Sequence, residues 1–311
     1  MKKRLLITGV TGFLGGALKE YFSRREKTFE VFGLSRRRQA GEGLFCADPA
    51  DASQMVRLLR RLQPEYIFPF SGGDRRNPES LFLSQYLVTQ CLLEAILKAG
   101  LLGARVVIPG SAAEYGRPTA SRRLLTEEDQ LRPEGWYGFM KFMQTSLGLF
   151  YARHFGLNVM VGRIFNVTGT NAPARLAPGK FASDIALIEV GRKVPVIETH
   201  DLSGRRDFTD VNDVCAALWV IARRGRRGEV YNICSGRPVS IRGLLQQMLK
   251  HSKRRDCEIR EHKDETSGTF NVIGANAKIR QQLKWSPRVS LSASLRQTLE
   301  SHRRRIKEDV S

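Results

Sequence analysis

Residues 4–16 read RLLITGVTGFLGG, a short apolar run followed by closely spaced glycines. The apolar run is typical of a buried parallel strand, and a helical pattern continues from the glycines to Phe22. A second strand is predicted over residues 29–34. Strand, glycine turn, helix and strand form a βαβ unit. The turn of such a unit can bind the pyrophosphate of a dinucleotide at the N-terminus of its helix.

The glycines follow the spacing Gly-x-x-Gly-x-x-Gly, with Gly9, Gly12 and Gly15 as its members. In a dinucleotide site, glycines allow a tight turn and a close approach of the backbone to the pyrophosphate. A purely structural turn would use the same residues. The position between two predicted strands favours the cofactor site.

The alternation of strands and helices continues along the chain. It predicts a Rossmann-type α/β fold with a doubly wound parallel sheet, whose ligands bind beyond the carboxyl ends of the strands. Glycine-rich or polar groups follow four of the strands, at Gly9–Gly15, Ser71-Gly72, Ser111 and Asn166. Further strands are predicted at residues 66–70, 105–108, 157–161 and 229–234, and helices at 48–62, 81–98, from 137 onward, 180–190 and 212–223.

After Asn166 the regular alternation gives way to a loop rich in Gly, Pro and Thr, and the end of the chain reads as a smaller helical lobe. We expect residues 1–165 to form an NADP-binding Rossmann domain, which a later segment near 206–234 rejoins. Residues 166–205 and 235–311 are expected to form a substrate-binding lobe.

Composition excludes several classes of protein. The 311 residues are 41% apolar and 26% charged, which is typical of a globular protein, and no apolar run reaches the ~20 residues of a membrane span. The net charge of +20 suggests nucleic acid, but the arginine clusters are spread along the chain. We therefore expect no nucleic-acid or membrane partner. Five scattered cysteines predict neither disulfides nor a metal site, and favour the cytoplasm.

Tyr137 and Lys141 are four residues apart at the start of an apolar helical run. In a helix they lie on one face. A fixed positive charge beside a phenol favours the phenolate, which makes a phenol usable as an acid or base near neutral pH. Such pairs are also common on helix surfaces. Ser111, at the end of an upstream strand, adds a hydroxyl at the same edge of the sheet and completes a Ser–Tyr–Lys set.

With these residues the chain resembles the extended short-chain dehydrogenases/reductases that act on nucleotide-diphosphate sugars (the NAD-dependent epimerase/dehydratase family). Within that family it looks closest to the GDP-4-dehydro-6-deoxy-D-mannose reductases. The resemblance covers nearly the whole chain. It rests on residues 8–15 (TGVTGFLG), 111–116 (SAAEYG), 137–141 (YGFMK), 163–166 (RIFN) and 206–211 (RDFTDV).

The resemblance implies catalytic roles for three residues. Tyr137 would protonate the sugar C4 oxygen, Lys141 would assist it and bind the nicotinamide ribose, and Ser111 would hydrogen-bond the same oxygen. The implied cofactor-binding residues are Gly9, Thr11, Gly12, Phe13, Leu14, Gly15, Arg36, Arg37, Asp48, Pro49, Phe70, Ser71, Gly72, Tyr137, Lys141 and Ile164. The implied substrate-binding residues are Ser111, Ala112, Tyr137, Asn166, Lys180 and Arg206, and no metal is implied.

Two details narrow the reaction. The related 4,6-dehydratases carry a carboxylate just after the strand-end hydroxyl, where this chain has Ala112 and Ala113. Glu114 lies one residue further, and continued strand alternation would turn it to the other face. At the end of the second strand, Arg36 and Arg37 stand where an NAD-binding unit carries an acidic residue. Guanidinium suits a 2′-phosphate, which favours NADP(H) over NAD(H).

The chain also departs from the family pattern. An Arg that grips the substrate diphosphate is usual near Glu265, and Arg260 or Lys263 are candidates to replace it. Gly73 replaces a polar residue, and Gln85 stands where Asn is common.

The leading hypothesis is a cytoplasmic NADPH-dependent 4-keto reductase of a nucleotide-linked 6-deoxy sugar, with GDP-4-keto-6-deoxy-mannose as the favoured substrate. A nucleotide-sugar 4-epimerase with tightly bound NAD is the nearest alternative. A non-catalytic dinucleotide-sensing or nucleic-acid-binding protein is a third. By analogy with the family we expect a homodimer in which the helix after Tyr137 and the helix at 81–98 pack into a four-helix bundle.

Overall fold

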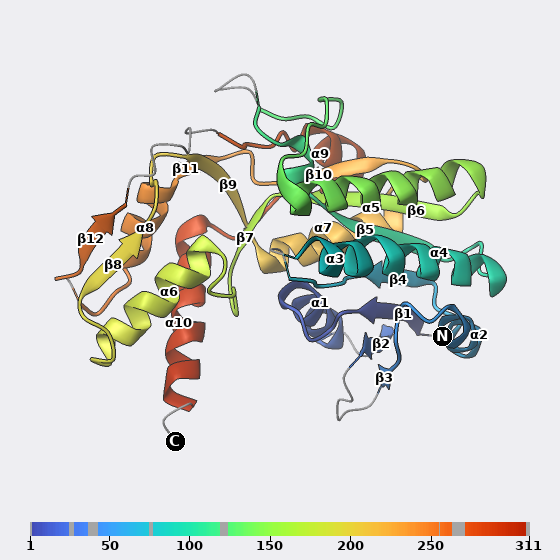
Figure 1. Ribbon diagram of the computed structural model, residues 1–311, viewed down its shortest axis with the longest axis horizontal. Coiled ribbons are helices and arrows are strands. Elements are labelled where there is room, and N and C mark those ends of the chain that lie inside the picture. Colours follow the sequence, from blue (N-terminus) through green and yellow to red (C-terminus); the bar gives the residue numbers. More distant parts are fainter. Residues whose placement is uncertain are drawn as a thin grey trace.

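The computed structural model describes residues 2–24, 28–36, 43–74, 77–118, 124–254, 256–262 and 271–308. The chain forms a large lobe around a parallel sheet and a smaller lobe beside it, joined by β7 and β9 (Figure 1). The N-terminus lies in the large lobe and the C-terminus in the small one.

The large sheet has seven parallel strands in the order β10-β6-β5-β4-β1-β2-β3. This is the doubly wound order, and it confirms the predicted α/β fold class. The strands are β1 (Lys3–Thr8), β2 (Phe29–Ser35), β3 (Leu44–Cys46), β4 (Tyr66–Pro69), β5 (Arg105–Ser111), β6 (Asn158–Ile164) and β10 (Val230–Ile233).

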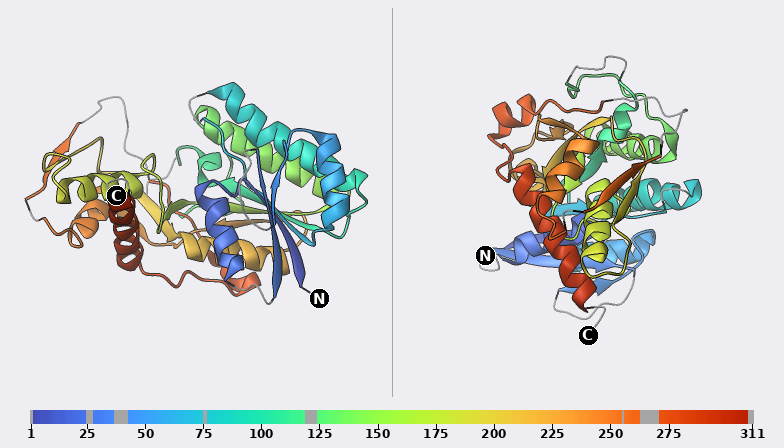
Figure 2. Two further views of the ribbon diagram at one scale, coloured as in Figure 1. Left: turned by 90° about the horizontal axis from the view of Figure 1, so that it is seen from below. Right: turned by 90° about the vertical axis from the view of Figure 1, so that its left-hand side faces the viewer.

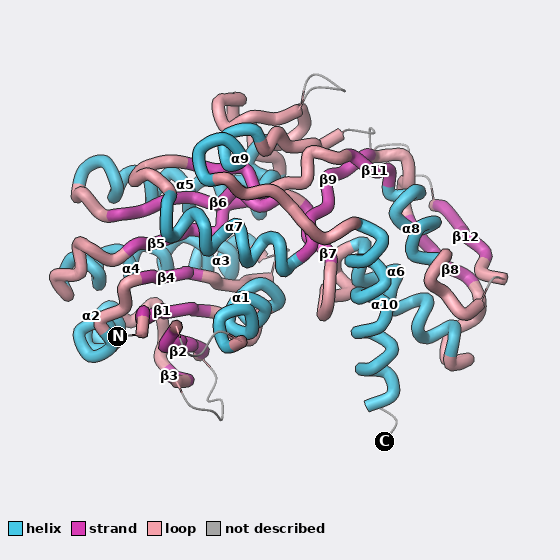
Figure 3. The backbone as a smooth tube through the Cα atoms, turned by 180° about the vertical axis from the view of Figure 1, so that it is seen from behind, coloured by secondary structure: helices cyan, strands magenta, loops and turns pink. Residues whose placement is uncertain are grey.

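Helices cover both faces of this sheet (Figures 2 and 3). Each face carries its own apolar core, because successive side chains of a strand point to opposite faces of the sheet. One face packs on α1 (Phe13–Ser23) and α7 (Val211–Arg224), and α9 (Ala277–Leu283) packs beside β10. The other face packs on α2 (Ala52–Leu62), α4 (Val88–Lys98) and α5 (Gly135–His154).

The predicted helix at 81–98 is longer and less regular than expected. It consists of α3 (Pro78–Leu81), a π-helical turn η1 (Phe82–Leu87) and α4. By length and composition the 21-residue run Pro78–Lys98 is apolar enough to cross a membrane. Its buried side chains, including Leu92, Leu93 and Ile96, pack in the core of the large lobe. The apolar character of the run is therefore that of a core helix.

The small lobe contains more strand than its sequence suggested. Its core lies between α6 (Ala177–Glu189), α8 (Ile241–Leu249) and α10 (Leu291–Glu308). Beside these helices, β11-β9-β7 form one small sheet and β12-β8 another. The strands are β7 (Asn166–Thr168), β8 (Val196–Thr199), β9 (Arg205–Asp210), β11 (Pro238–Ser240) and β12 (Glu258–Glu261).

Asp207 on β9 links the two lobes. Its side chain is fully buried and accepts hydrogen bonds from the backbone N–H and hydroxyl of Ser235 and from the N–H of Gly236, each at 2.7 Å. Ser235 and Gly236 follow β10 of the large sheet. Burial raises the pKa of Asp207, and these donors oppose that rise. The contact fixes the small sheet against the carboxyl edge of the large one.

The predicted start of the second helix is wrong. The Asp48-Pro49 pair was expected to begin the second helix, but α2 begins at Ala52 and its N-cap is Asp51. Asp51 accepts hydrogen bonds from the N–H of Gln54 and from the side chains of Ser53 and Gln54, which lower its pKa to about 2. Asp48 instead accepts one from the N–H of Ala50, at 3.0 Å, in the turn before the helix.

Candidate active site

The glycine loop between β1 and α1 has the geometry of a backbone cradle. Gly9 has φ of 61°, and a Cβ there would lie 2.6 Å from the carbonyl oxygen of Phe70. A Cβ on Gly15 would lie 2.3 Å from the carbonyl oxygen of Gly9. Gly12 is the N-cap of α1 and provides no side-chain cap, so the first N–H groups of the helix are left to other acceptors. Side chains are excluded at Gly9 and Gly15, and the N–H groups at the start of α1 suit an anion.

Strand register brings the ends of the neighbouring strands level with this loop. Thr8 pairs with Leu34 of β2 and with Pro69 of β4. The exposed Arg36 therefore follows β2 beside the glycine loop, and Phe70 and Ser71 follow β4 on its other side. The Ser71 hydroxyl oxygen is buried and has no hydrogen-bond partner among the described residues. A bare cradle and a buried orphan hydroxyl at one edge fit a nicotinamide dinucleotide.

The other predicted cofactor residues lie at varied depth. Phe70 and Ile164 are buried at the ends of β4 and β6, whereas Thr11 and Asp48 are exposed. Gly72 has open space where a Cβ would be, but Gly73 has none, since a Cβ there would lie 2.4 Å from Ser84 Oγ. That close approach explains the missing polar side chain at position 73. Arg37 lies outside the described residues.

Ser111 ends β5 and starts a 3₁₀ turn, η2 (Ala112–Tyr115). Its hydroxyl accepts a hydrogen bond from the N–H of Ala113 at 3.2 Å. Glu114 reaches back and accepts the Ser111 N–H at 2.6 Å, which completes a capping box. The acceptor role leaves the hydroxyl proton of Ser111 able to donate to a ligand.

Glu114 is turned away from that hydroxyl for a reason other than the expected one. The prediction assumed that the strand continued, but β5 ends at Ser111 and Glu114 lies in η2. Its carboxylate is fully buried and pairs with Arg163 of β6, with Oε2 3.0 Å from Nη2 and 3.1 Å from Nε. Thr145 of α5 donates to Oε1 at 3.1 Å. Burial raises the pKa of Glu114, while Arg163 and these hydrogen bonds favour the carboxylate.

Tyr115 completes the surroundings of Arg163. The guanidinium lies over the tyrosine ring, 4.7 Å from its centre, and Nη1 donates to the phenol oxygen at 3.0 Å. That oxygen lies 2.8 Å from both Asn232 Oδ1 and the Thr126 carbonyl, either of which can accept its proton. Burial raises the pKa of Tyr115 to about 12. Tyr115 therefore stays protonated at neutral pH and serves as a structural donor.

The first turn of α5 lies directly on η2. A Cβ on Gly138 would be 2.6 Å from the carbonyl oxygen of Ala113, so only glycine allows this approach. Tyr137 precedes that contact and is half-buried. Lys141 is buried, and its Nζ donates to the carbonyl oxygen of Pro109 on β5 at 2.9 Å. Lys141 thus anchors on β5 two residues before Ser111, and Tyr137 lies one helical turn before Lys141.

Two buried residues beside Lys141 were missed in the sequence. Gln144 accepts from Lys141 Nζ at 2.9 Å and donates to Thr89 of α4 at 2.8 Å. Gln144 is fully buried, and Thr89 is 1% exposed. The available signal was a glutamine three residues after Lys141, on the inner face of an otherwise apolar helix.

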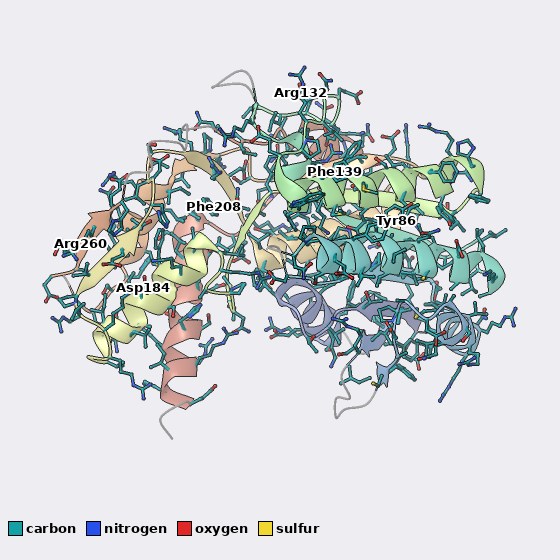
Figure 4. The ribbon with its side chains drawn as sticks, in the orientation of Figure 1. Tyr86, Arg132, Phe139, Asp184, Phe208 and Arg260 are labelled. Carbon is teal, nitrogen blue, oxygen red and sulfur yellow. The ribbon has the colours of Figure 1, made fainter. Side chains whose placement is uncertain are left out.

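The expected substrate-binding residues occupy different places. Ala112 is buried in η2, next to Ser111. Asn166 begins β7 and donates from Nδ2 to the Asp207 carbonyl at 3.0 Å. Arg206 on β9 donates to the Arg205 carbonyl at 3.0 Å, and burial lowers the pKa of its guanidinium. Lys180 on α6 pairs with Asp184 at 2.9 Å, and Figure 4 places Asp184 within the small lobe.

Arg260 is poorly placed to hold the substrate diphosphate. It lies on β12 at the outer end of the small lobe, away from α5 (Figure 4). Its guanidinium is 3.3 Å from Glu258 and 3.7 Å from Glu198. The two other residues of that prediction, Lys263 and Glu265, lie outside the described part of the chain.

The sequence profile of the NAD dependent epimerase/dehydratase family matches residues 5–234, which contain the glycine loop, Ser111, Tyr137 and Lys141. The chain belongs to the NAD dependent epimerase/dehydratase family. It is therefore a nicotinamide-dinucleotide-dependent enzyme of a family that modifies nucleotide sugars.

Relatives of this epimerase/dehydratase chain match it over most of its length. GDP-6-deoxy-D-mannose reductase of Pseudomonas aeruginosa is 26% identical over 99% of this chain and 100% of the relative. GDP-6-deoxy-D-talose 4-dehydrogenase of Aggregatibacter actinomycetemcomitans is 26% identical over 84% of this chain and 82% of the relative. The structure of RMD from Pseudomonas aeruginosa complexed with NADPH has a TM-score of 0.86 and 25% identity, covering 98% of this chain and 100% of that one.

The Glu114–Arg163 pair yields a stability prediction. Arg163→Leu leaves a buried carboxylate without its cation, so the free energy of unfolding is expected to fall by about 3–5 kcal/mol, measured by urea denaturation. Arg24→Leu removes a cation whose pair with Glu20 is exposed and should change the unfolding free energy far less. Similar small losses in both variants would show that the buried pair does not hold this region together.

Proposed function

We propose that this protein is an NADPH-dependent reductase of the C4 keto group of a nucleotide-diphosphate 4-keto-6-deoxy sugar, with GDP-4-keto-6-deoxy-mannose as substrate. The observation that carries the proposal is the position of Glu114. Elimination of water requires a free carboxylate next to the strand-end hydroxyl. Here Ala112 and Ala113 follow Ser111, and the next acid is buried against Arg163. Carbonyl reduction needs a proton donor but no such carboxylate.

The residues at the end of β5 can carry out the proton chemistry of this reaction. The cofactor, when bound, supplies a hydride to the C4 carbon. Tyr137 then protonates the C4 oxygen, and the Ser111 hydroxyl donates a hydrogen bond to the charge that develops there. The Lys141 ammonium lies one helical turn from Tyr137 and is proposed to assist it and to bind the nicotinamide ribose. Arg206 and Asn166, at the junction of the lobes, are proposed to contact the hexose or the diphosphate.

NADPH is favoured over NADH by the residues after β2. Arg36 is exposed at the end of that strand, level with the glycine loop. An acidic side chain there would accept the ribose 2′-hydroxyl, whereas guanidinium binds a phosphate. On this proposal the enzyme works in the cytoplasm. Residues 1–165, with the later segment near 206–234, bind the cofactor. Residues 166–205 and 235–311 hold the sugar nucleotide.

A substrate screen tests the proposal directly. The enzyme is mixed with NADPH and with GDP-, dTDP-, UDP- or CDP-linked 4-keto-6-deoxy sugars, and the product is identified by NMR. One NADPH oxidised per GDP-deoxyhexose formed is the expected result. Sugar inversion without net NADPH oxidation would identify a 4-epimerase and overturn the proposal.

Tyr137→Phe removes the proposed acid while keeping the ring. We expect kcat for ketone reduction to fall by about 10²–10⁴-fold, with NADPH binding measured by fluorescence largely retained. Tyr86→Phe is the matched control, because Tyr86 lies on η1 and stacks on Phe82. Full activity in Tyr137→Phe would assign the proton to another group.

Replacing Arg36 and Arg37 together by Ala removes the proposed 2′-phosphate contacts. NADPH should bind about 10–100-fold more weakly, since hydrogen bonds to a charged group are lost, and NADH affinity should change little. Isothermal titration with both cofactors measures the difference. Equal losses for NADPH and NADH would remove the basis for the 2′-phosphate assignment.

A homodimer is proposed from the outer face of α5 and the helical run before it. Phe139 and Phe150 on α5 are 42% and 48% exposed, and Leu83 on η1 is 48% exposed. Figure 4 places Phe139 and Tyr86 on these two neighbouring helices. Large apolar side chains gathered on one face favour contact with another protein, and a second copy of this chain would bury the face in a four-helix arrangement.

The double variant Phe139→Glu/Phe150→Glu places charge in that face, so light scattering after size exclusion should give a monomer mass where the wild type gives a dimer mass. Val194→Glu changes a 68% exposed apolar residue in the small lobe and should leave the dimer intact. A dimer that persists in the double variant would place the interface elsewhere.

A further inference from the structure

The amino-terminal ends of the strands form one edge of the large sheet, and the helices that cover the sheet end there. This edge faces away from the small lobe (Figure 1). The last turns of α2, α4, α5 and α7 all carry exposed basic side chains: Arg60, Arg61, Lys98, Arg153, His154, Arg223 and Arg224. Arg226 and Arg227, also exposed, follow α7. We call these residues the basic edge.

Hydrogen bonds between the ends of these helices show that the basic clusters meet. Arg227 Nη1 donates to the carbonyl oxygen of Gly156, which follows α5, at 3.3 Å. Arg60 Nη2 donates to the carbonyl oxygen of Lys98, at the end of α4, at 2.9 Å. The helices α4 and α5 in turn pack against each other. Groups that are far apart in the sequence are therefore neighbours on one edge of the fold.

Acidic residues near the basic edge compensate only part of its charge. The ion pairs there are Glu20–Arg24, Glu30–Arg4, Glu94–Lys98 and Glu229–Lys278, and Glu65 accepts the N–H of Arg4. Within the described part of the chain, the side chains of Arg153, Arg224 and Arg226 have no hydrogen-bond or ion-pair partner. Their charge is available to another molecule.

Helix stability explains part of this pattern, because cations are favoured at helix C-termini. It does not explain two large apolar side chains on the same edge. Leu102, in the turn between α4 and β5, is 53% exposed, and Phe155, directly after α5, is 48% exposed. Asn158 Nδ2, at the start of β6, donates to the Leu102 carbonyl at 3.4 Å, so the two turns are adjacent. Basic and apolar side chains are therefore exposed together.

We propose that the basic edge docks this protein on an anionic lipid surface, with Leu102 and Phe155 among the head groups. Each Lys or Arg that comes close to such a surface adds to the attraction, and exposed Leu and Phe side chains are typical apolar anchors at a membrane interface. A nucleic acid carries the same sign of charge, but a leucine has no ring on which a base can stack. The lipid surface fits both kinds of side chain.

Docking in this orientation leaves the candidate site accessible. The glycine loop and Ser111 lie at the carboxyl ends of their strands, on the opposite edge of the sheet. Ligands can therefore enter from the solvent while the protein is on the lipid surface. The expectation of no membrane partner rested on arginine clusters that are spread along the sequence, and the fold brings several of them to one edge.

The variant Arg153→Glu/Arg224→Glu/Arg226→Glu reverses three charges without removing a contact to the described residues. Binding to vesicles of equimolar phosphatidylcholine and phosphatidylglycerol, measured by co-sedimentation at physiological salt, is expected to fall at least about 100-fold from wild type. Vesicles of phosphatidylcholine alone should bind neither protein. A wild type that does not bind the anionic vesicles overturns the proposal.

Arg192→Glu/Lys250→Glu/Arg304→Glu is the matched control, because it makes the same change in net charge at exposed positions of the small lobe. Its binding to the anionic vesicles should stay within about threefold of wild type, since charges further than a Debye length from the lipid are screened. Urea denaturation checks that both triple variants fold. Equal losses of vesicle binding would show that net charge rather than the basic edge drives binding, which contradicts the proposal.

Leu102→Gln/Phe155→Gln tests the apolar contact at unchanged charge, and it serves as the second test if the charge-reversed protein does not fold. Binding to the anionic vesicles should fall about tenfold. Val194→Gln, at a 68% exposed position of the small lobe, should bind as the wild type does. Unchanged vesicle binding in the double variant counts against the proposal.

Fluorescence anisotropy with a labelled single-stranded RNA tests the other polyanion. The proposal predicts that the wild type binds the anionic vesicles and that the double Gln variant weakens this binding. RNA binding that the charge reversal abolishes, in a wild type that leaves the vesicles unbound, would identify a nucleic-acid surface and overturn the proposal.

Discussion

A carboxylate with none of its surface in water must take its hydrogen bonds from the protein, and Glu114 takes them from three other elements. Its oxygens meet the Ser111 N–H at the end of β5, Thr145 on α5 and Arg163 on β6, while Glu114 itself lies in η2. Arg163 is in turn bonded to Tyr115, which joins Asn232 of β10. The positions of the Ser111 hydroxyl and of α5 both depend on this cluster.

The same cluster decides what chemistry is available. A pair of this kind is not a strong source of stability, because the desolvation of both ions offsets much of their attraction. The pair occupies the carboxylate of Glu114, the first acidic residue after Ser111, so that this carboxylate is not available to a ligand. With that acid committed, the Ser111 hydroxyl and the Lys141 ammonium are polar groups that remain near the end of β5.

The α/β fold could be predicted from local sequence patterns. The glycine spacing predicted the first turn because a Cβ at Gly9 or Gly15 would collide with backbone. Apolar strand runs predicted the parallel sheet. The start of α2 was misplaced because Asp48 and Asp51 are both plausible caps, and only the path of the turn selects Asp51. The strands of the small lobe escaped prediction because they are short and pair across long stretches of sequence.

In the candidate site, too, local patterns predicted some residues but not the contacts between distant ones. Ser111, Tyr137 and Lys141 could be singled out because each lies in a recognisable pattern. The partner of Glu114 could not be predicted, since Arg163 is 49 residues away. Gln144 and Thr89, 55 residues apart, carry no local signal either. The π-helical turn η1 lies beside this contact, and such turns are frequent at functional sites, but the apolar pattern of its sequence does not distinguish it from an ordinary α-helix.

The buried hydrogen bonds that join Lys141, Gln144 and Thr89 all run in one direction, from the ammonium toward α4. The last of these bonds ends on the backbone carbonyl of Gln85, and the link at Gln144 is a carboxamide, which neither gains nor loses a proton at neutral pH. Gln144 and Thr89 can therefore stabilise the ammonium, but they cannot relay protons between α5 and α4. A group at the end of β5 that gives up a proton must therefore regain it by a route other than Gln144 and Thr89.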